Sequence, residues 1–94
     1  MRKRARKDDN HREIVAALTH AGVSVWDTSS LGSGGVDLVA GLRGQNFMLE
    51  IKDAAKAPSR RRLTEDEQEF HRTWRGHIDI VGTPEDALRA VGLL

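Results

Sequence analysis

The stretch GGVDLVAGLRGQNFMLEIKD, residues 34–53, decides the fold because two apolar runs flank the dipeptide Arg43-Gly44. A glycine in a two-residue connection between runs rich in β-branched and apolar residues is typical of a tight β-hairpin. We therefore expect one strand at Val36–Leu42 and a second at Gln45–Lys52.

The turn also fixes the register of the hairpin. If Arg43 and Gly44 are its two central residues, each earlier residue pairs with one correspondingly later, and Asp37 comes directly opposite Glu50. Side chains alternate between the two faces of a strand, so Lys52 points to the same face as Glu50. The other face of the second strand is apolar and carries Phe47, Leu49 and Ile51.

Opposed carboxylates on one sheet face need an explanation. Directly opposed Cβ atoms lie about 4.5–5.5 Å apart, and like charges placed there are destabilising. A hard divalent cation bound by carboxylate and carbonyl oxygens would turn this repulsion into a binding site, and Mg²⁺ is the natural candidate. The plain alternative is an exposed hairpin face on which Asp37 pairs diagonally with Lys52 while Glu50 faces water, a surface ion pair of little energetic weight.

Upstream of the hairpin, apolar residues on one stripe predict a helix at Asn10–Ala21. Asn10 is expected to cap this helix, with Glu13 three residues later completing a capping box. A short strand is expected at Val23–Trp26. The segment Asp27–Gly35 is turn-rich, and its small residues would allow a close approach of its backbone to another part of the molecule.

Downstream, the segment 53–62 is expected to be a polar, basic loop, and LTEDEQEFHRTW then begins a second long helix. Thr64 and Glu67 form a capping box at its start, and Phe70 with Trp74 forms an apolar pair four residues apart. We expect Trp74, like Trp26, to belong to the core.

The C-terminal part completes a small α/β domain. Gly76 is expected to end the second helix, and a strand at 78–81 follows. Thr83 as N-cap and Pro84 as first helical residue predict a final helix that runs through Leu93. The order is α-β-β-β-α-β-α, which predicts a small mixed sheet flanked by helices, with the last strand pairing in parallel after a helical crossover.

Composition limits the classes of function. The chain of 94 residues makes one small domain, whose modest core would benefit from a partner subunit. There is no cysteine, so any metal is held by oxygen or imidazole. The four histidines lack a zinc-ligand spacing, and the glycine-rich segment lacks the Lys-Ser/Thr ending of a P-loop, which disfavours zinc enzymes and nucleotide hydrolysis. No apolar run is long enough to span a bilayer, so we expect a cytoplasmic protein without membrane contact.

Positive charge is concentrated in two places although the net charge is only +1. Local clusters of this kind either solvate a surface or meet a polyanion. The first lies in a basic tail, residues 1–9, ahead of the domain at 10–94. The clusters are Arg2, Lys3, Arg4, Arg6 and Lys7, and then Lys56, Arg60, Arg61 and Arg62.

Asp37 followed by the EIK triplet at 50–52 is similar to the D…(D/E)-x-K signature of the PD-(D/E)XK nuclease superfamily. Over residues 10–94 the chain more closely resembles the VRR-NUC family of virus-type replication-repair nucleases, in its small stand-alone phage and bacterial form. The likeness rests on a first helix with Glu13, the loop GSGGVDL, the EIK strand, the LTEDEQ helix start and a closing β-α unit. The family usually has proline before the aspartate, where Val36 stands here; this departure removes no ligand.

The resemblance implies a restriction-endonuclease-like core and assigns roles to matching positions. Asp37 and Glu50, with the backbone carbonyl of Ile51, would bind the divalent metal, Mg²⁺ with Mn²⁺ as an alternative. Lys52 would orient or help to deprotonate the attacking water. A divalent cation lowers the pKa of water and offsets the charge that develops on phosphoryl oxygens, so the implied chemistry is hydrolysis of a phosphodiester.

Two further positions match the family pattern. Glu13 would join the metal shell through water, and Gln68 would lie beside the site. Each residue also has an ordinary structural interpretation, because Glu13 stands where a capping box places a glutamate. Gln68 shares a helical face with His71, Arg72 and Arg75 that could simply be solvated.

The resemblance implies a Mg²⁺-dependent DNA endonuclease that acts on branched DNA such as a Holliday junction during replication or repair. The stand-alone members resemble junction resolvases that work as homodimers with paired sites, in the cytoplasm of the host if phage-encoded. A nucleotide cofactor is not expected. The alternative is a non-catalytic nucleic-acid-binding or nuclease-accessory module. A sequence-specific restriction enzyme would need a base-reading element, for which 94 residues leave little room.

Overall fold

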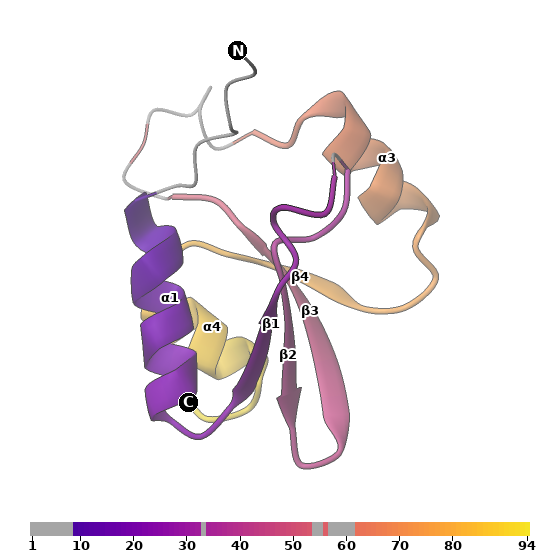
Figure 1. Cartoon of the computed structure of the whole chain (residues 1–94). Helices are drawn as coiled ribbons and strands as arrows, with labels where there is room; N and C mark the ends of the chain where they lie inside the picture. The colour runs from indigo at the N-terminus through magenta and orange to yellow at the C-terminus, as the bar shows by residue number, and fades with distance from the viewer. Residues whose placement is uncertain (1–8, 33, 54–55, 57–61) are drawn as a thin grey trace.

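A computed structural model describes residues 9–32, 34–53, 56 and 62–94 of the chain. The predicted order α-β-β-β-α-β-α is confirmed, and the described strands form one four-stranded mixed sheet in the order β1-β2-β3-β4 (Figure 1). The pairs β1–β2 and β2–β3 are antiparallel, whereas β3 and β4 pair in parallel, as predicted. The elements are α1 (Asp9–His20), β1 (Ser24–Asp27), β2 (Leu38–Leu42), β3 (Gln45–Ile51), α3 (Glu65–Thr73), β4 (Ile78–Val81) and α4 (Pro84–Ala90).

The central hairpin has the predicted register. Leu42 pairs with Gln45 across the turn, and Leu38 pairs with Leu49. Arg43 and Gly44 have φ values of 54° and 78°. Two successive positive φ angles give the turn a twist that matches that of the flanking strands. Both strands are slightly shorter than predicted, because β2 begins at Leu38 and β3 ends at Ile51.

One face of the sheet is covered by α1 and α4, which lie side by side against it (Figure 1). Ile14 and Leu18, one helical turn apart on α1, are fully buried there, while Ala21 at the end of the predicted stripe is exposed. The hydrophobic core lies between these two helices and the sheet, and it consists of buried aliphatic side chains. Besides those of α1, the core residues are Val23, Leu38, Ala40, Leu49, Ile51, Val81, Ala87 and Val91.

The opposite face of the sheet is largely open. Trp26, Val39, Met48 and Ile78 form one row across the four strands by their pairing. Trp26 is 60% exposed, and Trp74 is 44% exposed, so the expectation that both tryptophans belong to the core is wrong. Figure 1 shows α3 on this side, beyond the ends of β2 and β3 that lie away from the hairpin turn.

The first helix begins differently from the prediction. It starts at Asp9, so Asn10 lies inside its first turn. The Asn10 amide donates to the carbonyl of Gly82 at 2.8 Å, while its own Oδ1 has no hydrogen-bond partner among the described residues. Asn10 is therefore not the N-cap, and Glu13, which is exposed, completes no capping box with it. The asparagine instead ties α1 to the end of β4.

The other two helix starts are as predicted and their ends are not. Thr64 and Glu67 make a full capping box on α3, and Thr83 caps α4 with Pro84 in the first turn. However, α3 ends at Thr73 rather than near Gly76. The last helix ends at Ala90 instead of Leu93, because Gly92 follows with a φ of 88°, outside the right-handed helical region.

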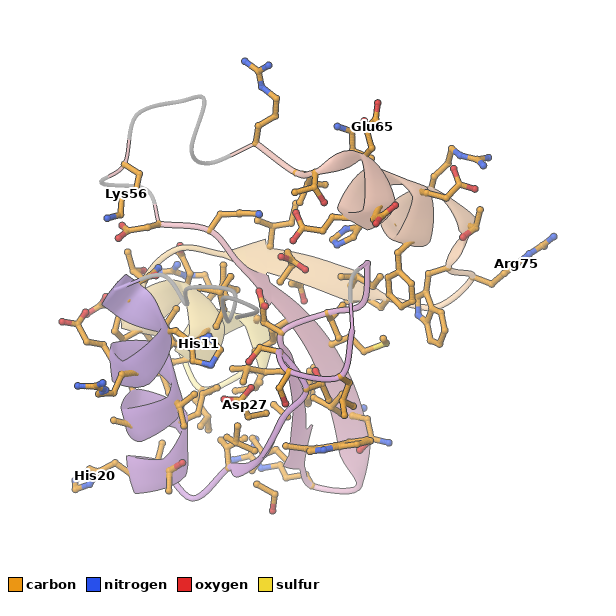
Figure 2. The ribbon with its side chains drawn as sticks, turned by 45° about the horizontal axis from the view of Figure 1, so that its top comes forward. His11, His20, Asp27, Lys56, Glu65 and Arg75 are labelled. Atoms are coloured by element: carbon orange, nitrogen blue, oxygen red, sulfur yellow. The ribbon has the colours of Figure 1, made fainter. Side chains whose placement is uncertain are left out.

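A partly buried polar pair joins α1 to β1. His11 is only 5% exposed, and its Nε2 lies 3.0 Å from Oδ2 of Asp27 (Figure 2). The other oxygen of Asp27 accepts hydrogen bonds from the backbone nitrogen and hydroxyl of Ser29, which shapes the start of the following loop. Among the helices in the described segments, none is long and apolar enough to cross a membrane.

Candidate metal centre at the base of the hairpin

Asp37 is held in place by the glycine-rich segment and by β3. Its backbone carbonyl accepts from the backbone nitrogen of Thr28 at 2.9 Å, and its own nitrogen donates to Leu49. Its carboxylate Oδ2 accepts from the backbone nitrogen of Ile51 at 2.8 Å. Asp37 lies one residue before β2 and its backbone nitrogen donates to Leu49 rather than to Glu50, so the ladder does not include the predicted Asp37–Glu50 pair. The Asp37 carboxylate is nonetheless close enough for its charge to act on Glu50.

Thr28 and Gly34 explain why this loop lies so close to the site. The Thr28 hydroxyl donates to the carbonyl of Val36 at 2.6 Å, which fixes the segment just before Asp37. Gly34 has a φ of 89°, and a Cβ there would lie 3.3 Å from the Cβ of Asp66 in α3. The close backbone approach that the small residues indicated is therefore an approach to the first turn of α3.

Glu50 is the buried acid of the site. Its side chain is 1% exposed, although it projects from the sheet face that is mostly open. The interpretation of this surface as an exposed hairpin face, with Glu50 in water, is therefore wrong. The covering element is α3, which supplies His71 with its Nε2 3.9 Å from Glu50 Oε1. Oε1 itself has no hydrogen-bond donor within reach among the described residues.

Burial and neighbouring carboxylates strongly disfavour the charged form of Glu50. Desolvation, followed by the charge of Asp37 and the hydrogen bond and charge of Glu67, raises the pKa of Glu50 from 4.5 to about 10. Without a cation the carboxyl group is therefore protonated at neutral pH. A divalent cation would replace that proton and offset the repulsion, which is the usual way in which crowded carboxylates remain ionised.

Lys52 lies between two acids. Its Nζ is 2.8 Å from Glu67 Oε1 and 3.8 Å from Glu50 Oε2. Desolvation lowers the pKa of Lys52, but the hydrogen bond and charge of Glu67, with Glu50 and Asp37 adding to them, outweigh it and leave the pKa raised. Lys52 is therefore an ammonium ion, suited to orienting a nucleophile and stabilising negative charge rather than to accepting a proton.

The sequence interpretation missed two residues of α3 at this site. Glu67 was assigned only to the capping box and His71 to a solvated face, yet both lie against Glu50 or Lys52. Their spacing of four residues was the available signal, because side chains four apart share one face of a helix. Burial of Glu67 itself raises the pKa of its carboxyl group by desolvation, but the hydrogen bonds from Lys52 and Thr64 outweigh this and leave the pKa lowered.

Glu13 and Gln68 are not brought together with this group by any hydrogen bond or ion pair among the described residues. Glu13 is an exposed residue on α1. Gln68 is also exposed, and its Nε2 donates to the carbonyl of Leu63 at 3.0 Å, so the side chain folds back over the start of α3. The site that the structure assembles is therefore built from Asp37, Glu50, Lys52, Glu67 and His71.

Most of the two basic clusters lies outside the described residues: Arg2, Lys3, Arg4, Arg6, Lys7, Arg60 and Arg61. Arg62 is exposed just ahead of α3, and Lys56 is partly exposed after β3.

The donor set fits a hard cation that keeps several waters. Asp37 and Glu50 offer carboxylate oxygens, one of them buried without a donor, and the Ile51 backbone borders them. Across the described ranges, no group of three or more His, Asp or Glu side chains is arranged to hold a metal by itself. Two carboxylates completed by water and backbone are the common arrangement for Mg²⁺, which dehydrates reluctantly.

Comparison of the chain with protein-family models, with curated proteins and with solved structures finds no match.

Proposed function

We propose that this chain is a Mg²⁺-dependent DNA endonuclease with a restriction-endonuclease-like core, and that it is a member of the VRR-NUC family. The observation that carries the proposal is the burial of Glu50 beside Asp37, with Lys52 two residues further along the chain, just past the end of β3. A carboxylate pair at the core edge of a sheet is costly unless something uses it. The D…E-x-K order is the one that the resemblance associates with phosphodiester hydrolysis.

In this proposal Asp37 and Glu50 hold the cation, with the Ile51 carbonyl as a third protein ligand. When bound, Mg²⁺ supplies Lewis acidity toward the phosphate and favours deprotonation of the attacking water. Lys52, as an ammonium ion, orients that water and stabilises charge on the phosphoryl oxygens. Glu67 holds the ammonium group of Lys52 through the 2.8 Å contact. The same ammonium group lies 3.8 Å from Glu50 Oε2.

The substrate we propose is branched DNA such as a four-way junction, cut by a homodimer. A two-fold dimer would present two sites to opposing strands, which a single domain of 94 residues cannot do. The exposed Arg62 and the basic segments around it would contact phosphates, and phosphate contacts position a protein without reading sequence. Recognition would therefore depend on branch geometry.

A second candidate is a nucleic-acid-binding or nuclease-accessory module without catalysis. It is favoured by one observation: the ammonium group of Lys52 is already engaged by Glu67 at 2.8 Å. If Lys52 only neutralises the neighbouring carboxylates, its role is structural and the site need not catalyse a reaction. The two candidates differ in whether DNA is cut when Mg²⁺ is present.

The experiment compares cleavage of labelled four-way junction, flap, single-stranded and linear duplex DNA, with Mg²⁺ or EDTA, by wild type and Lys52→Ala. We expect Mg²⁺-dependent cutting that is strongest on the junction and absent in Lys52→Ala, with DNA binding kept in both. A folded, DNA-binding wild type that cuts none of the substrates would favour the accessory module. A monomer that cuts linear duplex as readily as junctions would refute the branched-DNA and dimer part.

A further inference from the structure

Two buried polar atoms face each other across the site without hydrogen bonds. His71 Nε2 and Glu50 Oε1 are each inaccessible to solvent and each lack a hydrogen-bond partner among the described residues, and they lie 3.9 Å apart. Buried side-chain polar atoms nearly always have a partner, so an isolated pair of this kind needs an explanation. The distance exceeds a hydrogen bond by about 1 Å. A small side-chain movement would close it.

We propose that His71 is a positioning residue of the metal centre. Its Nε2–H donates to Glu50 Oε1 and fixes the orientation of that carboxylate toward the cation. The inference rests on the proposed function, because it assigns a role to a residue around the same Asp37–Glu50 pair. His71 does not touch the substrate in this account.

Each carboxylate oxygen of Glu50 lies near a different side-chain nitrogen. Oε2 lies 3.8 Å from Lys52 Nζ, and Oε1 lies 3.9 Å from His71 Nε2. Donors of this kind orient a carboxylate toward a cation, and these two nitrogens are the ones that the described residues place beside Glu50. With Oε1 held by His71, the carboxylate cannot rotate freely about its last torsion.

The helix places His71 with some rigidity. Glu67, one turn earlier on the same face of α3, is fixed by Thr64 and Lys52, which anchors the start of the helix to the site. The aromatic ring of Phe70 packs edge-on against the imidazole, with centroids 6.4 Å apart at 70°. His71 therefore reaches Glu50 from a helix that is fastened to the same strand.

A partner outside the ligand shell changes how well the ligands bind. Carboxylates and imidazoles that bind metals are usually oriented by hydrogen bonds from such partners, and removal of one typically weakens metal binding by about 10–100-fold. His77 gives a contrast within the chain, since it is exposed and already 3.1 Å from Asp79. Its imidazole therefore already has a carboxylate partner.

The test measures Mn²⁺ affinity by the electron paramagnetic resonance of free Mn²⁺, without DNA, so that binding is read independently of cleavage. We expect His71→Leu to bind Mn²⁺ about 10–100-fold more weakly than wild type. His71→Gln, whose Nε2 can replace the imidazole donor, should stay within a few fold of wild type. His20→Leu, at the far end of α1, is the matched control and should change nothing (Figure 2).

The outcomes separate this inference from the proposed function. If wild type binds Mn²⁺, Asp37→Asn does not, and folded His71→Leu binds as wild type does, the positioning role is refuted and the metal site stands. Equal weakening in His71→Leu and His71→Gln would also refute it, because the donor would then be irrelevant. If wild type itself binds no Mn²⁺, the metal centre and this inference fail together.

Discussion

One carboxylate oxygen of Glu67 joins the start of α3 to the lysine of the EIK strand. Glu67 Oε1 accepts from Lys52 Nζ at 2.8 Å and from the backbone nitrogen of Thr64 at 2.9 Å. The same oxygen thus completes a capping box and neutralises a half-buried ammonium ion. The helix that covers Glu50 is positioned by a group that belongs to the site itself.

This double role predicts unequal effects of two substitutions. Thr64→Ala removes only the cap and should lower the free energy of unfolding by about 1 kcal/mol. Glu67→Ala should cost more, because it also leaves Lys52 without its closest partner. Urea unfolding measures both, with Glu65→Ala, an exposed residue of the same turn, as control. Equal losses in the two variants would show that the Lys52 contact contributes nothing.

Glu50 gives the metal-free protein a definite pH dependence. Its pKa is about 10 in the folded protein against 4.5 ordinarily, so the folded state holds the proton more tightly. The resulting stability is complete below about pH 4.5 and is lost progressively as the pH rises toward 10. In EDTA we therefore expect this group to lower the urea midpoint between pH 6 and pH 9.

Glu50→Gln tests the cause of that slope. The amide is nearly isosteric with the protonated acid and does not titrate, so the variant should show a flatter profile and greater stability than wild type at pH 9 in EDTA. Addition of Mg²⁺ should stabilise wild type but not the variant. An unchanged slope in Glu50→Gln would mean that other groups set the pH dependence.

Two adjacent glycines offer a matched test of the loop that holds Asp37. Gly34 has a φ of 89° and a close neighbour in Asp66, whereas a Cβ at Gly35 would meet nothing within 4 Å. Gly34→Ala should therefore cost about 1–2 kcal/mol and weaken metal binding, because left-handed backbone is strained for alanine and the loop must move away from α3. Gly35→Ala should leave thermal unfolding and Mn²⁺ affinity nearly unchanged.

Gly32→Ala separates the effect of backbone strain from the effect of the close approach to α3. Gly32 has a φ of 141° but open space around it, so its alanine variant tests backbone strain alone. It should destabilise the protein without a matching loss of Mn²⁺ affinity. A Gly34→Ala variant that behaves like Gly32→Ala would show that contact with α3 is not needed to hold the site.

Arg62 should contribute to DNA binding through phosphate alone. Each phosphate contact adds about 0.9 to the slope of log K against log salt concentration, so Arg62→Ala should reduce the slope by about 1 on every DNA tested. Arg43→Asn is the control, because asparagine tolerates the positive φ of the turn and position 43 lies at the opposite end of the hairpin. A slope that both substitutions lower equally would contradict a localised basic surface.

The hairpin was predictable from sequence because its turn determines every pair that follows. Two central residues fix the register, and the observed pairs follow it from Leu42 and Gln45 to Leu38 and Leu49, next to Asp37 and Glu50. Caps of α3 and α4 were predictable for a related reason, since each depends on residues three positions apart. These features need no knowledge of the rest of the fold.

Contacts between segments far apart in the chain could not be predicted from the sequence. Asparagine is a common N-cap residue, but the Asn10 amide donates to the carbonyl of Gly82, which is 72 positions away in the chain. His71 stands on what looks like a solvated face until α3 is laid over Glu50. Trp26 shows the opposite case, since a residue type that favours cores lies largely exposed, on the sheet face opposite to the one that α1 and α4 cover.

Cleavage by a matched pair of variants tests whether Asp37 and Glu50 hold the metal ion needed for DNA hydrolysis. Wild type, Asp37→Asn and Glu69→Gln are compared on a labelled four-way junction with Mg²⁺ and with EDTA. Glu69 is an exposed acid of α3 paired with Arg72, so its loss should leave activity intact. The account predicts Mg²⁺-dependent cutting by wild type and Glu69→Gln and none by folded, DNA-binding Asp37→Asn. Cutting by Asp37→Asn at the wild-type rate, or no cutting by any of the three, would contradict it.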